Sequence, residues 1–259
     1  MASKQDPLAE LEGVAPCKEL NAIVEGAFNS LQIIEPWRGA STDHPQLQQV
    51  IQKIQGHTIV YFEAIDTSIK TAQDGYGFSC DAIELCGYLL DPETDTDDLQ
   101  EYIGDMQSKA KRAHEDSLMT LNKFRDVRKG LIEITKTIPK EALAGPEGAK
   151  GFFIKLISPL IGGKRDVSLE SAIKELNLAA LDMAKLADNV DKFADWWSGM
   201  ETVLKKAEKS ASDLRPGKDK LRVKGIQKTW TTIRDDYKQY KVQIIQLQDH
   251  YTQGIEPAK

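Results

Sequence analysis

Residues 226–251 read IQKTWTTIRDDYKQYKVQIIQLQDHY, and their apolar positions alternate in steps of four and three. This spacing is a heptad repeat, which keeps one apolar seam of a helix facing its partners. Its members are Ile226, Trp230, Ile233, Tyr237, Tyr240, Ile244, Leu247 and Tyr251. Because a single long amphipathic helix is unstable alone, the stretch predicts a helix that packs lengthwise against others.

Helical periodicity also marks the first third of the chain. Apolar residues predict a helix over 20–34, which we expect to end before Pro36, since proline lacks a backbone donor. A second helix is predicted over 47–69. We expect it to stop at Gly75 and Gly77, because glycine is a poor helix former.

The middle of the chain predicts further helices. A short one is expected over 81–90, and two long ones over 99–138 and 168–212. Pro139 is expected to end the first of these long helices. We predict an all-α fold, an elongated bundle of about four or five long antiparallel helices that forms one domain over 1–259.

Composition limits the function classes. The chain has 259 residues, 34 Lys plus Arg and 40 Asp plus Glu, for a net charge of -6. An acidic balance argues against nucleic acid as a partner. Residues 1–16 lack the apolar core of a secretory signal, so we expect a soluble product made in the cytosol that another route releases.

The three cysteines are Cys17, Cys80 and Cys86. Three thiols do not make a disulfide framework in a chain of this size. Reduced thiols in a cytosolic product are the preferred interpretation, with a bridge between Cys80 and Cys86 as the alternative.

The search for catalytic and metal-binding motifs gives little. The histidines are far apart and match no metal motif; they are His44, His57, His114 and His250. The acidic run over 91–98 resembles the start of a calcium loop, but Thr96 stands where that loop requires glycine, so we interpret the run as helix capping. We expect no enzymatic activity, no cofactor and no metal.

An unusual segment lies between the two longest predicted helices. Residues 141–167 read EALAGPEGAKGFFIKLISPLIGGKRDV, and an antiparallel pair would place them at one tip of the bundle. Burying their seven large apolar side chains is worth on the order of 10 kcal/mol. We name residues 141–167 the apolar head; its large apolar members are Phe152, Phe153, Ile154, Leu156, Ile157, Leu160 and Ile161.

Three covers for the apolar head are open: the predicted short helix over 81–90, a protein partner, or lipid. The head is too short to span a bilayer, so lipid contact would be a shallow insertion. Basic residues flank the apolar run and could meet anionic headgroups; they are Lys150, Lys155, Lys164 and Arg165. A buried loop that caps an ordinary bundle is an equally weighted alternative.

Long helices, an apolar tip between the two longest of them and an amphipathic N-terminal helix together resemble a known toxin family. They look like the α-helical pore-forming toxins of the cytolysin A type, including the alpha-xenorhabdolysin and haemolysin BL-like members. Residues 186–200, LADNVDKFADWWSGM, followed by the helix over 230–251, are similar to the final helical pair of the xenorhabdolysin-like members.

The resemblance implies a soluble form that hides its apolar head, binds a lipid membrane, swings the head out and oligomerises. Residues 17–34 would line the pore. The implied hinges are Gly145, Gly148, Gly151, Gly162 and Gly163. The apolar head is short for the family, and Lys155 and Pro159 interrupt its apolar run. These departures favour the interpretation that the chain is one subunit of a two- or three-component toxin. The alternative function is a non-lytic helical module for protein interaction or cell-death signalling.

Overall fold

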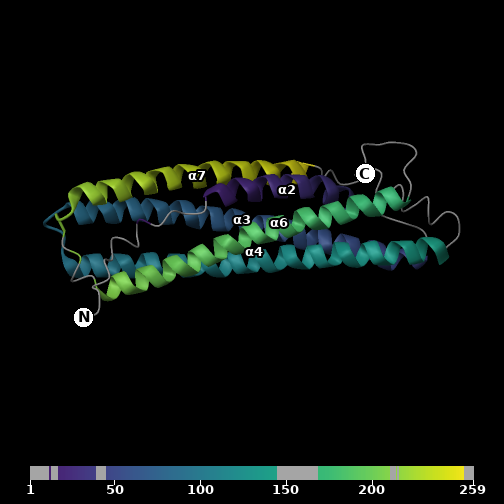
Figure 1. The fold of residues 1–259 in the computed structure, drawn as a ribbon, viewed down its shortest axis with the longest axis horizontal. Helices are drawn as coiled ribbons and strands as arrows, with labels where there is room; N and C mark the ends of the chain where they lie inside the picture. Colours follow the sequence, from purple (N-terminus) through teal and green to yellow (C-terminus); the bar gives the residue numbers. More distant parts are fainter. Residues whose placement is uncertain are drawn as a thin grey trace. The chain divides into compact units, whose positions relative to one another are not determined.

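The computed structural model of the chain contains five long helices (Figure 1). The structure describes Glu12, 17–38, 45–144, 169–210, Leu214 and 216–253. The helices are α2 (Cys17–Arg38), α3 (Pro45–Leu90), α4 (Thr96–Ala144), α6 (Leu169–Lys209) and α7 (Lys220–Gln253). No strand occurs among these described residues, and the predicted all-α class with its long antiparallel helices is confirmed.

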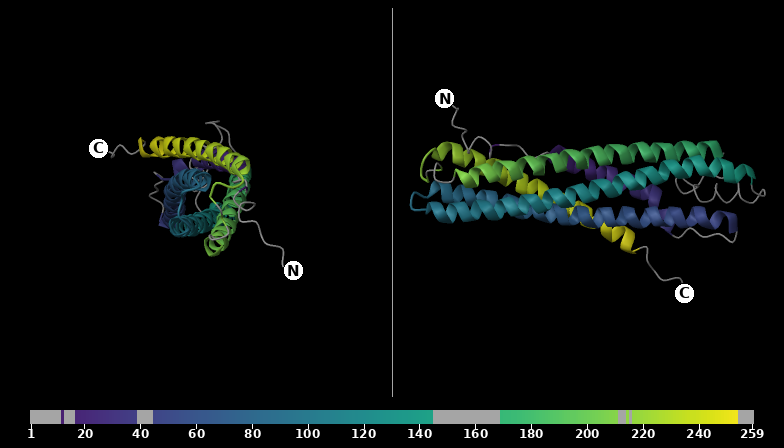
Figure 2. Two further views of the ribbon diagram at one scale, coloured as in Figure 1. Left: turned by 90° about the vertical axis from the view of Figure 1, so that its left-hand side faces the viewer. Right: turned by 90° about the horizontal axis from the view of Figure 1, so that it is seen from below.

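The helices build two compact units. Unit 1 comprises Met1–Asn21, Ser68–Leu118 and Val190–Ile245, and unit 2 comprises the three remaining stretches, Ala22–Thr67, Met119–Asn189 and Gln246–Lys259. Each of the five helices contributes residues to both units, although only residues 17–21 of α2 belong to unit 1. In unit 1, the segments of α3 and α4 lie side by side and run in opposite directions (Figure 2).

The core of unit 1 is aromatic. The ring centroid of Phe78 on α3 lies 5.2 Å from that of Trp197 on α6 and 5.5 Å from that of Trp230 on α7. Both tryptophans are buried, and the half-buried Trp196 lies 4.6 Å from Trp197. Edge-to-face contacts of this kind add to the free energy gained from burial. The adjacent tryptophans therefore belong to the core, as the heptad seam predicts for Trp197.

Unit 2 is centred on Tyr61 of α3. Its ring lies 5.9 Å from the ring of Phe124 on α4, and its hydroxyl donates to the backbone carbonyl of Ala27 on α2. Leu31 and Ile34 of α2 are buried in the same unit. The amphipathic helix predicted over 20–34 is therefore present, with its apolar side against α3.

The predicted break in α3 is wrong. The helix continues through Gly75 and Gly77, so the separate helix expected over 81–90 is the end of α3. At Gly75, tertiary packing outweighs the low helix propensity of glycine. The ring of Tyr237 packs so close to the helix backbone that a Cβ on Gly75 would lie only 2.1 Å from its Cε1 atom. The aromatic ring occupies the space that a larger residue would need.

Two predicted helix ends are also wrong. Helix α2 continues through Pro36 to Arg38, and α4 continues through Pro139 to Ala144. Proline removes one backbone hydrogen bond but keeps a helical φ angle, so a helix held by its neighbours tolerates it. In α2, the buried Ile34 lies two residues before the proline, and Arg38, which contacts Phe62, lies two residues after it.

The acidic run before α4 caps the helix, as predicted. The backbone N–H of Asp97 donates to Oδ1 of Asp95 at 2.8 Å, which is the contact expected of an N-cap aspartate. Glu93 N–H donates to Oδ1 of Asp91 at 3.0 Å and forms a second turn of the same kind. Carboxylates here also favour the positive end of the helix dipole.

Candidate functional site

The apolar head cannot be placed in this architecture, because residues 145–168 lie outside the described part of the chain. This applies to the predicted membrane-contact residues Phe152, Phe153, Ile154, Leu156, Ile157, Leu160 and Ile161, the basic residues Lys150, Lys155, Lys164 and Arg165, and the hinges Gly145, Gly148, Gly151, Gly162 and Gly163. Their roles stay predictions. What the structure does provide is the position of the elements that flank them, α4 before and α6 after.

His57 packs as a structural residue between α3 and α4. The ring of His57 lies against the backbone of Gly130, where a built Cβ would approach Nε2 to 2.1 Å. Burial lowers the pKa of His57, Lys53 lowers it further, and the carboxylates Glu133 and Asp126 oppose this shift. Among residues 17–38, 45–144, 169–210 and 216–253, no group of three His, Cys, Asp or Glu side chains could hold a metal ion.

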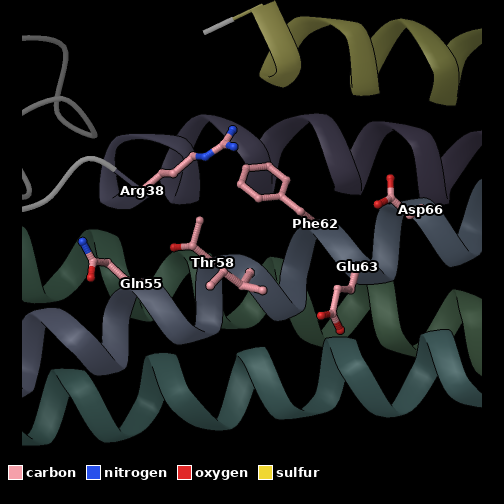
Figure 3. Close-up of a pocket in the computed structure, with 7 residues that line it drawn as sticks. Arg38, Gln55, Thr58, Phe62, Glu63 and Asp66 are labelled. Atoms are coloured by element: carbon pink, nitrogen blue, oxygen red, sulfur yellow. The ribbon is translucent and has the colours of Figure 1, made fainter. Parts of the chain in front are cut away.

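A pocket of about 440 Å³ opens on unit 2 (Figure 3). It is lined by Arg38 of α2 and by one side of α3, namely Gln55, Thr58, Ile59, Phe62, Glu63 and Asp66. The α3 residues recur at helical spacing beside the buried seam that contains Tyr61. This pocket could not be predicted from the sequence, because its lining positions are mostly polar and are typical of a solvated helix face.

The polar groups of the pocket already have partners. The Arg38 guanidinium lies 5.4 Å from the centroid of the Phe62 ring, a cation–π contact that Figure 3 shows. Nζ of Lys123 lies 3.3 Å from Oε2 of Glu63, and Gln248 donates to Asp66 at 2.9 Å. The part of the pocket lining that is free for a ligand is apolar and includes Ile59, which is 60% exposed. The arrangement can hold an apolar group and contains no nucleophile beside a base.

Helix α2 is held in unit 2 by a close fit and few polar contacts. A Cβ built on Gly26 would lie 3.4 Å from Cδ1 of Leu186 on α6, so the glycine allows a close helix approach. Ser30 turns its hydroxyl back to the Gly26 carbonyl at 2.7 Å. The Tyr61 hydroxyl donates to the Ala27 carbonyl, and this hydrogen bond joins α2 to α3.

A pair of acidic residues is packed between α3 and α4 in unit 1. Asp116 is 6% exposed and lies 2.7 Å from Nζ of Lys70. Oδ2 of the half-buried Asp74 has no hydrogen-bond partner among the described residues. Burial, and next the charge of Asp116, raise the pKa of Asp74, while Lys70, Arg112 and Lys109 oppose that shift.

The two described thiols are free. Cys80 and Cys86 both lie on α3, and Cys86 is buried. Burial raises the pKa of the Cys86 thiol to about 11. The bridge between them that the sequence left open is therefore not formed.

Comparison with known proteins yields structural matches only. No family model matches the sequence, and no curated protein matches it. The soluble form of AhlB, from the tripartite alpha-pore forming toxin AHL of Aeromonas hydrophila, matches with a TM-score of 0.63 and 10% identity, over 90% of this chain and 94% of that chain. The chain has the fold of a tripartite α-pore-forming toxin component.

A second solved structure supports the same fold. Soluble SmhB, from the tripartite alpha-pore forming toxin Smh of Serratia marcescens, matches with a TM-score of 0.50 and 11% identity, over 93% of this chain and 92% of that chain. The resemblance to α-helical pore-forming toxins is thus confirmed at the level of the fold. Within the ranges that the structure describes, no helix is both long enough and apolar enough to cross a membrane.

Proposed function

We propose that this protein is one subunit of a membrane-active α-helical pore-forming toxin, which acts on a lipid membrane together with partner subunits or further copies of itself. The observation that carries the proposal is the match to AhlB over 90% of the chain, combined with an apolar segment between α4 and α6. Fold alone does not determine function, so the apolar segment supplies the physical argument.

In this proposal the apolar head is the membrane anchor. Its large apolar residues leave water by shallow insertion, which stabilises the bound form by about 25 cal/mol for each Å² buried. Lys150, Lys155, Lys164 and Arg165 contact anionic headgroups and contribute about 1 kcal/mol each near the surface. The glycines on either side of the run supply the backbone freedom for the head to change its position.

Helix α2 is the second moving part of the proposal. Its buried side carries Ile23, Val24, Ala27, Leu31 and Ile34, while Lys18, Asn21, Glu25 and Asn29 are exposed. The apolar side of such an amphipathic helix can leave the bundle and pack against lipid or a neighbouring subunit instead. Its polar side then faces water. Residues 17–34 would then line the pore.

The proposal includes no enzymatic step. The matched structures of AhlB and SmhB are components of tripartite pore-forming toxins, and the pocket on unit 2 has an apolar lining and partnered polar groups. The chain would be made as a soluble protein, released, and then bound to its target membrane.

Vesicle experiments test the function. We expect the purified chain to sediment with phosphatidylserine-containing vesicles and to release an entrapped dye, alone or after partner subunits are added. Phe153→Asp should abolish sedimentation without loss of helix content. The matched control is Leu181→Asp, which places the same charge at an apolar α6 residue that is already 57% exposed and should leave binding intact.

The alternative of a non-lytic interaction module predicts other results. A chain that ignores anionic and neutral vesicles, and that is inactive on red cells and cultured cells, would contradict a toxin role and favour that module. If Phe153→Asp bound as well as the unmodified chain, the apolar head would have no part in membrane contact.

A further inference from the structure

The ionic residues of unit 1 are sorted by sign along the chain. Residues 71–108 contain ten Asp or Glu and no Lys or Arg. Residues 205–228 contain nine Lys or Arg and three Asp or Glu, which gives 9 - 3 = +6. The first stretch spans the end of α3, the turn after it and the start of α4, and the second runs from the end of α6 to the start of α7.

Most of these charged side chains are exposed. We name two surfaces by their exposed members: the acidic surface comprises Glu84, Asp91, Glu93, Asp97, Asp98 and Glu101, and the basic surface comprises Lys205, Lys209, Lys218, Lys220, Lys224 and Lys228. No ion pair joins a member of one to a member of the other in the described parts of the chain.

The two surfaces share one end of unit 1. The backbone N–H of Gly217 donates to the carbonyl of Leu89 at 2.9 Å, and a Cβ built on Gly217 would lie 3.1 Å from Cβ of Pro92. Gly217 has a φ of 79°, which lets the connection before α7 approach the turn before α4 this closely. The two turns also lie side by side in Figures 1 and 2.

The basic surface works against the stability of its own helix. Lys218, Lys220 and Lys224 lie at the N-terminal end of α7, where the helix dipole is positive and cations are unfavourable. Leu221 lies among them and is 89% exposed, the highest value of any large apolar residue described. A site with unpaired lysines around an exposed leucine has the features of a surface that binds an acidic partner.

We propose that this end of unit 1 binds the same end of a second copy of this chain, with the basic surface of each copy against the acidic surface of the other. A twofold axis creates both contacts at once, because each chain carries the two surfaces next to each other. Leu221 would then be covered by the neighbouring chain, where the Tyr88 ring, which is 37% exposed, donates its hydroxyl to Glu84 of the acidic surface.

An anionic membrane is the less suitable occupant. A bilayer that attracted the basic surface would repel the acidic surface, which the Gly217 hydrogen bond holds beside it and which has the same number of charged members. A second copy satisfies both signs. The proposal is independent of the toxin function, because it rests on the charges and contacts of unit 1 alone.

Sedimentation velocity of the full chain tests this pairing. At 20 mM salt we expect the sedimentation coefficient to rise with protein concentration. At 500 mM salt we expect a monomer, because salt screens exposed charges. Lys220→Glu with Lys224→Glu, or Glu93→Lys with Glu101→Lys, should each weaken self-association at least tenfold.

Two mixtures make the test specific for the paired surfaces. The two charge-reversed double variants should associate with each other more strongly than either does with itself, because one keeps its full acidic surface and the other its full basic surface. A chain that carries all four changes keeps only 4 - 2 = 2 net charges on each surface and should associate with itself least. The control is Lys129→Glu with Lys136→Glu, at exposed positions of α4 in unit 2. It changes the net charge as much as Lys220→Glu with Lys224→Glu does, and it should leave self-association unchanged.

Three results would overturn the pairing. The first is a sedimentation coefficient that does not depend on concentration at 20 mM salt. The second is association that both surface reversals leave unchanged. The third is a chain that stays monomeric but binds phosphatidylserine vesicles through Lys220 and Lys224, which would assign the basic surface to a membrane.

Discussion

The ring of Tyr237 on α7 lies against the backbone of Gly75 on α3, so close that a Cβ on Gly75 would stand 2.1 Å from its Cε1 atom. Both residues are buried in unit 1. The ring of Tyr237 also lies 6.2 Å from that of Phe193, and so joins this contact to the aromatic core. A glycine that would break an isolated helix thus allows α3 and α7 to approach each other.

Gly75→Ala is expected to destabilise the protein by about 2 kcal/mol or more, because the added methyl group collides with a buried ring. Gly77→Ala is the matched control, since a Cβ there meets nothing within 4 Å. That change should stabilise the helix by up to about 1 kcal/mol. Urea unfolding measures both. Equal effects of the two substitutions would contradict the proposed role of Gly75.

Tyr61→Phe should loosen α2 without unfolding unit 2. The substitution removes the hydrogen bond to the Ala27 carbonyl and keeps the ring, with an expected loss of about 1 kcal/mol. Hydrogen exchange should become faster at amides of α2 and change little in α4. Tyr76→Phe, at an exposed ring of α3, is the control and should leave exchange in α2 unchanged.

Asp74→Asn should stabilise the fold at neutral pH by about 1 kcal/mol, because its carboxylate has a buried oxygen without a partner. The pKa of Asp74 is raised in the folded state, so the folded state binds its proton more tightly than the unfolded state does. Stability therefore falls as pH rises from about 4 through the raised pKa.

The asparagine variant should lose this part of the pH dependence. Asp105→Asn, at an exposed position of α4, controls for the change in net charge. Thermal unfolding between pH 4 and pH 8 distinguishes the two variants. If Asp74→Asn were less stable than the unmodified chain at pH 7, the carboxylate would be stabilising and our interpretation would fail.

Cys86 should resist thiol reagents at pH 8 until the chain unfolds, because its side chain is 1% exposed and its pKa is about 11. Chains that keep one cysteine, with the others replaced by serine, separate the signals. A Cys86-only chain should react at least tenfold more slowly than a Cys80-only chain, whose thiol is half-buried. Comparable rates would show that α3 opens locally around Cys86.

The heptad seam of α7 could be predicted from sequence because each of its positions depends on one helix alone. Its members from Ile226 to Leu247 are buried as expected. Helix ends were harder. Propensity placed breaks at Gly75, Pro36 and Pro139, whereas contacts with other helices decide whether such residues are tolerated, and those contacts depend on the register between helices.

The residues of the pocket and of the acidic pair could not be found from sequence for the same reason. Asp74 and Asp116 are far apart in the chain and come together only through the register of α3 against α4. The toxin resemblance, in contrast, depended on the order and length of elements, which periodicity does give. The apolar head was predicted from composition, and its role depends on experiment.

The most direct test of the central claim is whether the apolar head enters lipid. An environment-sensitive fluorophore on Phe153→Cys, in a chain whose other cysteines are replaced, should become brighter and shift to shorter wavelength when vesicles are added. Quenchers placed within the acyl region should then reduce its emission. Fluorescence that vesicles leave unchanged, in a folded chain that still binds them, would contradict the claim that the apolar head is the membrane anchor.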